Sequence, residues 1–287
     1  MNNILELHKV NKKLDQFSLN NISFSLPKGF IMGFIGHNGA GKTTTIKLIL
    51  NMLRKDSGLI KVFGKDNSIN KREIMERIGV VMDSPYYVED WSLLEVEQSI
   101  SPFYKSWNSS VYDNLLKDFH LDSNKKIKEL SRGMKVKLMI AVALSHDADL
   151  LILDEPTSGL DAPSRNELID IITTFISDEN KGVLFSTHIT RDLEKVADYI
   201  TFINNGNIFY NGTKDDLLEK YLIVKGRKGE LTRKEQSYIH GYREHSVGFD
   251  GLVERKLLRN LPTSLLFEPC NLDDILIRTN MGGAYNE

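Results

Sequence analysis

Short apolar runs recur along the middle of the chain, at residues 31–35, 78–82, 150–154, 183–187 and 199–203. Each run is nearly continuous, which is typical of a strand buried on both faces. Helical patterns lie between the runs. Because alternating strands and helices favour a sheet covered on both sides, the pattern predicts a mainly parallel α/β core.

The first part of the chain, up to about residue 28, has a different pattern. Residues 4–7 and 21–26 alternate apolar and polar positions. This alternation is expected of strands with one face in the core and one face in water. We therefore expect a small antiparallel sheet before the parallel core.

Residues 84–147 show helical patterns and no strand pattern. The clearest helices are predicted at residues 93–100, 111–119 and 134–144. A block of this kind indicates a small helical subdomain inserted into the α/β core.

The character of the chain changes again after residue 218. Basic residues and histidines gather between residues 225 and 245, and short mixed segments follow. We expect residues 1–218 to form the main domain and residues 219–287 to form a small C-terminal accessory extension. The basic cluster is either a solvated face or a binding surface, and a solvated face is the more common case.

Composition narrows the class of protein. The formal net charge of −2 over 287 residues gives no electrostatic reason to expect a nucleic-acid partner. The single cysteine, Cys270, excludes an internal disulfide and fits a reducing compartment. No apolar run approaches the ~20 residues that span a bilayer, and the N-terminus does not resemble a signal peptide. We expect a cytoplasmic chain that needs another polypeptide to work at a membrane.

A phosphate-binding loop is predicted directly after the run at residues 31–35, before a helix expected at residues 44–52. It contains Gly36, His37, Asn38, Gly39, Ala40, Gly41, Lys42, Thr43 and Thr44. The glycines let backbone N–H groups point at phosphate oxygens, and the following helix favours the same anion. Lys42 would neutralise the outer phosphates, and the Thr43 hydroxyl would ligate Mg²⁺.

The run at residues 150–154 ends in two carboxylates, Asp154 and Glu155. In phosphate-loop ATPases the first carboxylate lies beside Mg²⁺. A carboxylate directly after it can reach the attacking water, so Glu155 is the candidate general base. The alternative is a strand end that is acidic without a function, and the phosphate loop upstream disfavours it.

Three further motifs resemble those of ABC-type ATPases. D-E-P-T-S-G-L-D at residues 154–161 resembles the acidic motif joined to the D-loop, which here contains Asp161. L-S-R-G-M at residues 130–134 resembles the family signature, usually written LSGGQ, and His188 resembles the switch histidine. The motifs follow the family's order and approximate spacing, and the resemblance covers roughly residues 4–215.

The resemblance implies a P-loop NTPase core that hydrolyses ATP with Mg²⁺, with Lys42, Glu155 and His188 as the catalytic residues. Ser131 and Gly133 would contact the γ-phosphate held by a second ATP-binding subunit, so that two subunits clasp two ATP molecules head to tail. Ser131 is also a preferred N-cap residue, and capping alone is the alternative. The alternative for His188 is an ordinary surface hydrogen bond.

Two positions depart from the family pattern. Asp83 stands where the family usually has Gln, and it either ligates the metal or lies at the periphery of the site. The family often stacks an aromatic residue on adenine, but here Leu14 stands near the expected place. Phe17 is the nearby aromatic residue, and it either stacks on the base or packs in the core.

The signature variant S-R-G-M-K resembles that of bacterial exporters whose ATPase and membrane subunits are separate chains, the phenol-soluble-modulin exporters among them. We therefore expect a peripheral protein at the cytoplasmic face of the cell membrane. It would power export of an antibiotic, drug or amphipathic peptide through a transmembrane permease by nucleotide-driven closure of a homodimer or heterodimer. The helical block is the expected docking surface for the permease.

Other functions remain open at this point. A non-transport or regulatory ABC-type ATPase could act on a membrane sensor partner. An ABC-type ATPase of DNA repair fits less well, because that type needs a long coiled coil before the signature. The translation type carries two cassettes, and this chain has one. A small-molecule kinase would need neither the signature nor the loop around Asp161.

Overall fold

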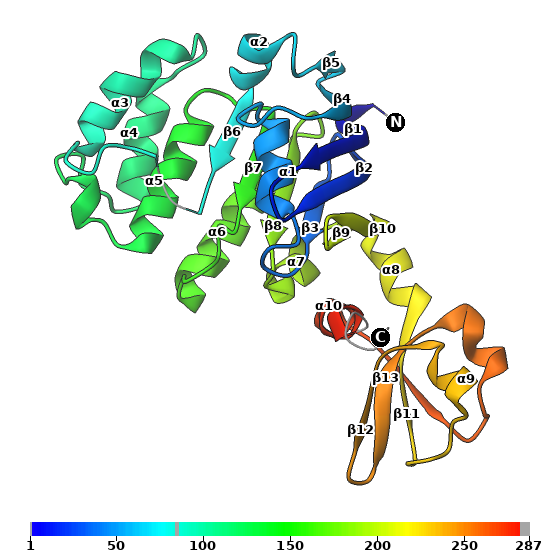
Figure 1. The fold of residues 1–287 in the computed structure, drawn as a ribbon. Coiled ribbons are helices and arrows are strands. Elements are labelled where there is room, and N and C mark those ends of the chain that lie inside the picture. Colours follow the sequence, from blue (N-terminus) through cyan, green and yellow to red (C-terminus); the bar gives the residue numbers. More distant parts are fainter. Residues whose placement is uncertain (1, 84–85, 282–287) are drawn as a thin grey trace.

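The computed structural model describes residues 2–83 and 86–281. Figure 1 shows the helical block on one side of an α/β core and the C-terminal sheet on another, with helix α10 (Leu272–Met281) between the core and that sheet. None of the helices in these two ranges has the length and apolar character that crossing a bilayer would require.

The core is a six-stranded sheet of order β10-β9-β3-β8-β7-β6. Its strands are β3 (Ile31–Ile35), β6 (Ile78–Val81), β7 (Leu150–Asp154), β8 (Gly182–Thr187), β9 (Tyr199–Asn204) and β10 (Asn207–Thr213). All neighbours pair in parallel except β9 and β10, which are antiparallel. The predicted mainly parallel core is confirmed.

Both faces of this sheet are covered, because successive side chains of a strand point to opposite sides. Ile31 and Ile35 of β3 belong to one hydrophobic cluster, which includes residues of α5 (Arg132–Leu144), α6 (Ala162–Phe175) and α7 (Thr190–Val196). Met32 and Phe34 belong to another, which includes residues of α1 (Lys42–Ile49) and the N-terminal sheet. This two-sided burial explains why the strands read as continuous apolar runs.

The N-terminal sheet is antiparallel and has the order β2-β1-β4-β5. Its strands are β1 (Asn3–Lys13), β2 (Ser18–Pro27), β4 (Ser57–Val62) and β5 (Lys65–Asp66). The first two were expected from the sequence, whereas β4 and β5 were not. After β5 the short helix α2 (Lys71–Met75) leads back to the core sheet.

The helical block contains α3 (Leu93–Ile100), α4 (Ser109–Asp118) and α5 (Arg132–Leu144), with 3₁₀ turns at Ser101–Phe103 and Ile127–Glu129. All three helices were predicted. Each begins at a side-chain cap, because Ser92, Asn108 and Ser131 accept hydrogen bonds from backbone N–H groups three residues later. Residues 84–85 of the expected block lie outside the described residues.

The C-terminal extension forms its own antiparallel sheet, of order β12-β13-β11-β14, with a separate small hydrophobic cluster. It starts after α8 (Lys214–Lys220) with β11 (Tyr221–Gly226), and continues through α9 (Arg233–Gln236), β12 (Ile239–His245), β13 (Gly248–Glu254), a 3₁₀ turn (Arg255–Asn260), β14 (Leu266–Pro269) and α10 (Leu272–Met281). The sequence predicted a small extension but not this sheet.

Cys270 lies where β14 passes into α10, far along the chain from the nucleotide motifs. Its thiol is buried and donates to the carbonyl of Tyr221 at 3.3 Å. Burial raises the pKa of this thiol to about 11. Cys270 is therefore a small buried residue rather than a reactive thiolate.

Candidate functional site

The phosphate-binding loop joins the end of β3 to the start of α1, as predicted. A side chain at Gly36 would put its Cβ 2.4 Å from the carbonyl oxygen of Ile203, so only glycine fits there. Gly39 and Gly41 have φ of +82° and +114°, a conformation that residues with a Cβ rarely adopt. Helix α1 begins directly after the loop at Lys42, so its N-terminus faces the bend.

Lys42 is buried inside this loop, with 5% of its surface exposed. Its ammonium donates to the carbonyls of Gly36 at 2.8 Å and His37 at 3.2 Å, and lies 3.0 Å from Oε1 of Glu155. The His37 ring in turn lies 3.2 Å from Oδ1 of Asn204, at the end of β9. The loop therefore holds its cation against the carboxylate predicted as the general base.

Asp154 and Thr43 form a pair of hard oxygen ligands. The Thr43 hydroxyl donates to Oδ2 of Asp154 at 2.8 Å, and the Ser186 hydroxyl donates to Oδ1 at 2.9 Å. Asp154 is only 1% exposed, and this burial raises its pKa despite both hydrogen bonds. A buried carboxylate beside a hydroxyl is a donor set that suits Mg²⁺, so the residues present fit the expected ion.

Ser186 was not singled out from the sequence. It lies directly across from Asp154, because β7 and β8 are parallel neighbours in this register. The sequence does contain a signal for it, because a serine is an unusual residue inside an otherwise apolar buried strand.

Glu155 is the residue at which the predicted catalytic groups meet. Its Oε2 lies 2.7 Å from Nδ1 of His188 and accepts from the backbone N–H of His188 at 3.3 Å, while Oε1 faces Lys42. Glu155 has a φ of +52°, which is uncommon for a residue with a side chain. Its backbone N–H donates to the carbonyl of Ser186 at 2.9 Å, which helps to hold this conformation.

The signature residues lie at the start of α5, beside the D-loop. The Ser131 hydroxyl accepts from the N–H of Met134 at 3.3 Å, so the predicted N-cap is present. Asp161 caps α6 in the same way, accepting from the N–H of Ser164 at 3.0 Å, and its hydrogen bonds with Ser164 hold its pKa below the usual range. Among the described residues, no hydrogen bond or ion pair joins Ser131 or Gly133 to the phosphate loop.

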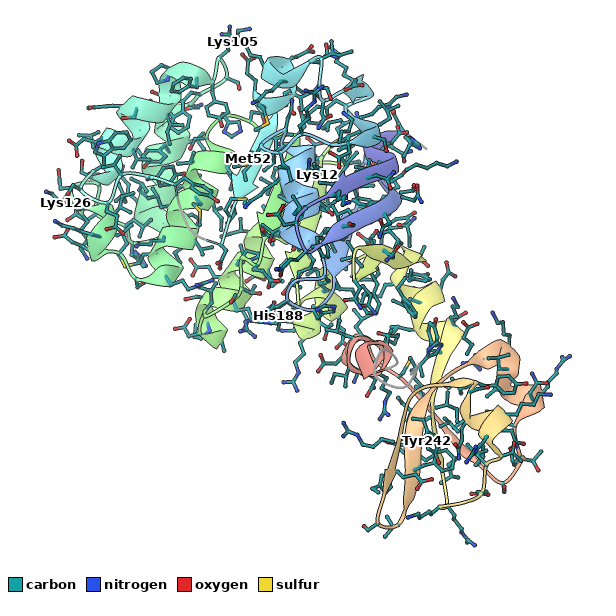
Figure 2. All side chains as sticks on the ribbon, in the orientation of Figure 1. Lys12, Met52, Lys105, Lys126, His188 and Tyr242 are labelled. Carbon is teal, nitrogen blue, oxygen red and sulfur yellow. The ribbon has the colours of Figure 1, made fainter. Side chains whose placement is uncertain are left out.

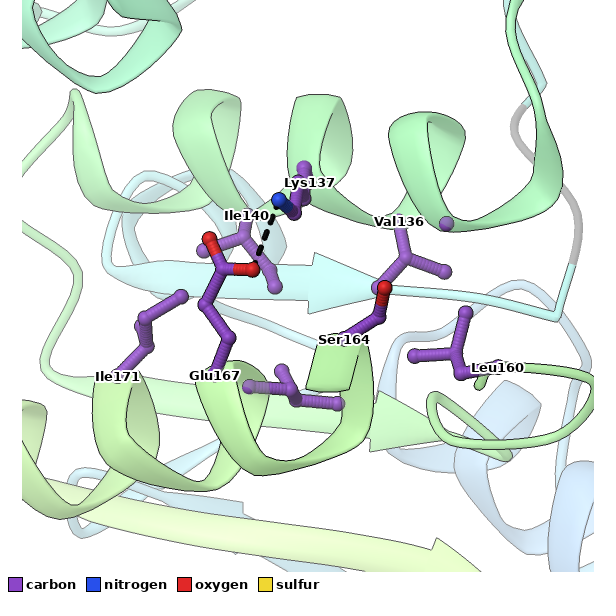
Figure 3. Close-up of a pocket in the computed structure, with 9 residues that line it drawn as sticks. Val136, Lys137, Ile140, Leu160, Ser164, Glu167 and Ile171 are labelled. Carbon is purple, nitrogen blue, oxygen red and sulfur yellow. Dashed lines mark ion pairs between the residues drawn. The ribbon is translucent and has the colours of Figure 1, made fainter. Parts of the chain in front are cut away.

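Figure 3 shows the narrow crevice between α5 and α6 where these two motifs meet. Lys137 and Glu167 form an ion pair of 2.8 Å across it. A Cβ on Gly133 would lie 3.6 Å from both Leu160 and Ser164, which is ordinary van der Waals contact. The described part of the chain therefore leaves room for alanine at position 133.

Asp83 lies at the exposed end of β6, where its carboxylate pairs with the guanidinium of Arg132 in the signature. Arg132 also lies against the D-loop, since a Cβ on Gly159 would be 3.0 Å from Cδ of Arg132. No hydrogen bond in the described residues connects Asp83 to Thr43 or Asp154. Metal ligation by Asp83 stays a prediction, and its contact with the signature was not foreseen.

Phe17 lies beside the phosphate loop, because a Cβ on Gly41 would come within 2.9 Å of its ring. It is partly buried and packs against the cluster on the α1 side of the sheet. Leu14 is more exposed, at 37%. The structure thus brings Phe17 to the edge of the loop, and stacking on adenine stays a prediction.

Comparison with known proteins identifies the family. The model of the protein family described as "ABC transporter" matches residues 19–158. The bacitracin transport ATP-binding protein BcrA of Bacillus licheniformis is 32% identical over 244 residues, covering 81% of this chain and 79% of BcrA. The chain belongs to the ABC transporter ATP-binding proteins. It is an ABC transporter ATPase, as the motifs predicted.

Two further similarities agree with this assignment. The lantibiotic transport ATP-binding protein SrtF of Streptococcus pyogenes is 33% identical over 217 residues, covering 73% of this chain and 93% of SrtF. A solved structure described as an ATP-binding subunit of an ABC transporter superposes with a TM-score of 0.69 at 28% identity, covering 75% of this chain and 91% of that one. The predicted fold, with its N-terminal antiparallel sheet and helical insert, is confirmed.

Asp154→Asn is expected to stabilise the folded ATPase at neutral pH by about 1–3 kcal/mol, because it removes a charge buried away from water. Burial raises the pKa of Asp154, so the folded state holds this proton more tightly than the unfolded state. The carboxyl therefore destabilises the fold increasingly as the pH rises through its folded pKa. The advantage of the variant should shrink as the pH is lowered from the folded pKa toward the unfolded value of about 3.9, and urea unfolding from about pH 7 down to about pH 4 measures it.

Asp161→Asn is the matched control for this effect. The Asp161 carboxyl is exposed, and its hydrogen bonds to Ser164 hold its pKa below the usual range. Removing its charge is therefore not expected to raise the free energy of unfolding. An equal increase in the free energy of unfolding in both variants, or no increase in Asp154→Asn, would contradict the assigned cost of burying Asp154.

Proposed function

We propose that this ABC transporter ATPase powers export of an antibiotic, drug or amphipathic peptide through a separate transmembrane permease at the cytoplasmic face of the cell membrane. The observation that carries the proposal is the contact of Glu155 with both Lys42 and His188, next to the Asp154–Thr43 pair. Support for the cargo class comes from relatives named for bacitracin and lantibiotic transport.

Each residue has a distinct task in hydrolysis. Lys42 and the N-terminus of α1 would hold the outer phosphates. Glu155 would take the proton of the attacking water, and His188 would orient that carboxylate through the 2.7 Å bond while reaching the γ-phosphate. Thr43 and Asp154 would hold Mg²⁺, which neutralises charge on the phosphate oxygens when bound.

The signature belongs to a second site in this proposal. Among the residues that the structure describes, Ser131 and Gly133 share no bond with their own phosphate loop, and none of these residues gives a steric reason for glycine at position 133. Close approach of a phosphate held by another copy would give such a reason, because a glycine at a helix start exposes backbone N–H groups. Two subunits would then clasp two ATP molecules head to tail.

The permease would dock at the junction of the core and the helical block. A groove of about 320 Å³ lies there, lined largely by apolar side chains that include Met82, Tyr86, Phe103 and Tyr104. Phe103 and Tyr86 are 75% and 72% exposed, which is unusual for large aromatic residues. An amphipathic helix from a membrane subunit would bury this surface, in line with the docking role expected for the helical block.

Gly133→Ala is expected to fold normally and to bind ATP, yet to lose hydrolysis by about 100-fold or more. The added methyl has room in the single chain, but it would stand between the signature N–H groups and the partner's phosphate. Steady-state ATPase assays, nucleotide binding and urea unfolding test this together. Full activity in Gly133→Ala would refute the shared site.

Glu155→Gln is expected to slow hydrolysis by about 10²–10⁴-fold, because the amide cannot accept the proton of water. Binding should survive, since Lys42 and the loop are untouched, and the protein should accumulate as an ATP-bound dimer. Light scattering after gel filtration measures the dimer. Lys42→Ala, which should not bind ATP, is the control, and a monomeric Glu155→Gln protein at saturating ATP would contradict head-to-tail closure.

Transport itself is tested in a sensitised bacterium that expresses the chain together with its permease. Wild-type protein should raise the concentration of bacitracin, a lantibiotic or an amphipathic peptide needed to stop growth, and Glu155→Gln should not. Protection that persists in Glu155→Gln would show that hydrolysis does not drive export. The absence of protection against every compound of this class would refute the proposed cargo.

A further inference from the structure

The C-terminal extension is attached to the helix that follows the switch histidine. Thr190 begins α7 two residues after His188, and its hydroxyl donates to Oδ1 of Asp273 in α10 at 2.8 Å. Thr190 is only 1% exposed, so its hydroxyl is hidden from bulk water. Figure 2 places His188 on the side of the core that faces α10.

A second bond holds the two helices together near the other end of α7. Oε1 of Glu194 accepts from the backbone N–H of Leu272, at the start of α10, at 3.1 Å. Leu272 and Ile275 are fully buried in the same hydrophobic cluster as Leu193 of α7. Two polar bonds and membership of one hydrophobic cluster therefore join α7 to α10.

Helix α7 is in turn coupled to two parts of the nucleotide site. The segment before it carries His188, whose ring meets Glu155 at 2.7 Å. On its other side, Asp192 lies 3.8 Å from Arg165, whose guanidinium donates to the D-loop carbonyl of Leu160 at 3.4 Å. A shift at the start of α7 would therefore displace the partner of Glu155.

We propose that Asp273 is a positioning residue for His188, acting through Thr190. The carboxylate accepts the Thr190 hydroxyl and so keeps the first turn of α7 where His188 can hold Glu155. The C-terminal extension thereby becomes part of the support of the ATPase site rather than an independent appendage. This inference rests on the catalytic roles proposed for Glu155 and His188.

Asp273→Ala is expected to lower kcat about 10-fold or more while leaving KM for ATP nearly unchanged, because binding depends on the phosphate loop and not on α7. Asp273→Asn keeps an acceptor oxygen for Thr190 and should retain activity near that of the wild type. Asp274→Ala is the matched control, since Asp274 bonds to Asn271 at the start of its own helix.

The second readout is the nitrogen NMR signal of the His188 imidazole in the 287-residue chain, assigned by comparison with His188→Gln. Asp273→Ala should move the signal of Nδ1, which lies against Glu155, whereas Asp273→Asn and Asp274→Ala should leave it in place. A lower kcat with an unmoved His188 signal would overturn the positioning role, and so would unchanged kcat in Asp273→Ala.

Thr190→Val removes the donor of the same hydrogen bond. It tests the positioning role if Asp273→Ala does not fold. Valine keeps the shape of threonine but has no hydroxyl, so it should reproduce the loss of kcat, whereas Thr190→Ser should not. Wild-type activity in Thr190→Val would overturn the inference. A Glu155→Gln protein that hydrolyses ATP at the wild-type rate would instead refute the proposed chemistry, whatever the Asp273 variants show.

Discussion

The carboxylate of Glu155 is the point on which the site depends. Lys42 enters from the start of α1, His188 follows β8, and Glu155 itself follows β7, so three separate segments meet at one side chain. They meet because β3, β7 and β8 are parallel neighbours, which brings their carboxyl ends to one edge of the sheet. The uncommon backbone conformation of Glu155 is held there by its bond to the carbonyl of Ser186.

The sequence predicts those parts of the site whose residues are close together in the chain. A strand, a glycine-rich bend and a helix start follow one another in the chain, so the loop around Lys42 can be recognised without any tertiary contact. Asp154 and Glu155 are recognised in the same way at the end of an apolar run. Ser186 could not be placed so directly, because its partnership with Asp154 depends on which strands are neighbours and on their register.

The other features that the sequence did not predict all depend on contacts between residues far apart in the chain. The position of Asp83 was expected from family spacing, but its pairing with Arg132 requires the helical block to be packed on the core. The sheet of the C-terminal extension is built from short mixed segments whose pairing order, β12-β13-β11-β14, is not sequential. The residues next to Asp273 in the sequence do not predict that its carboxylate will bind a threonine at the start of α7.

Two positions show that this chain is shaped by something beyond its own stability. Burying Asp154 raises its pKa and so makes its ionised form costly to the fold, although a neutral side chain would fit the same strand end. Glycine at position 133 has a lower helix propensity than alanine, although the described residues leave room for a methyl group there. Both departures are understood if the carboxylate faces a cation and the glycine faces a phosphate. The first ligand would belong to this chain's own nucleotide and the second to another copy's, which is the arrangement that head-to-tail closure requires.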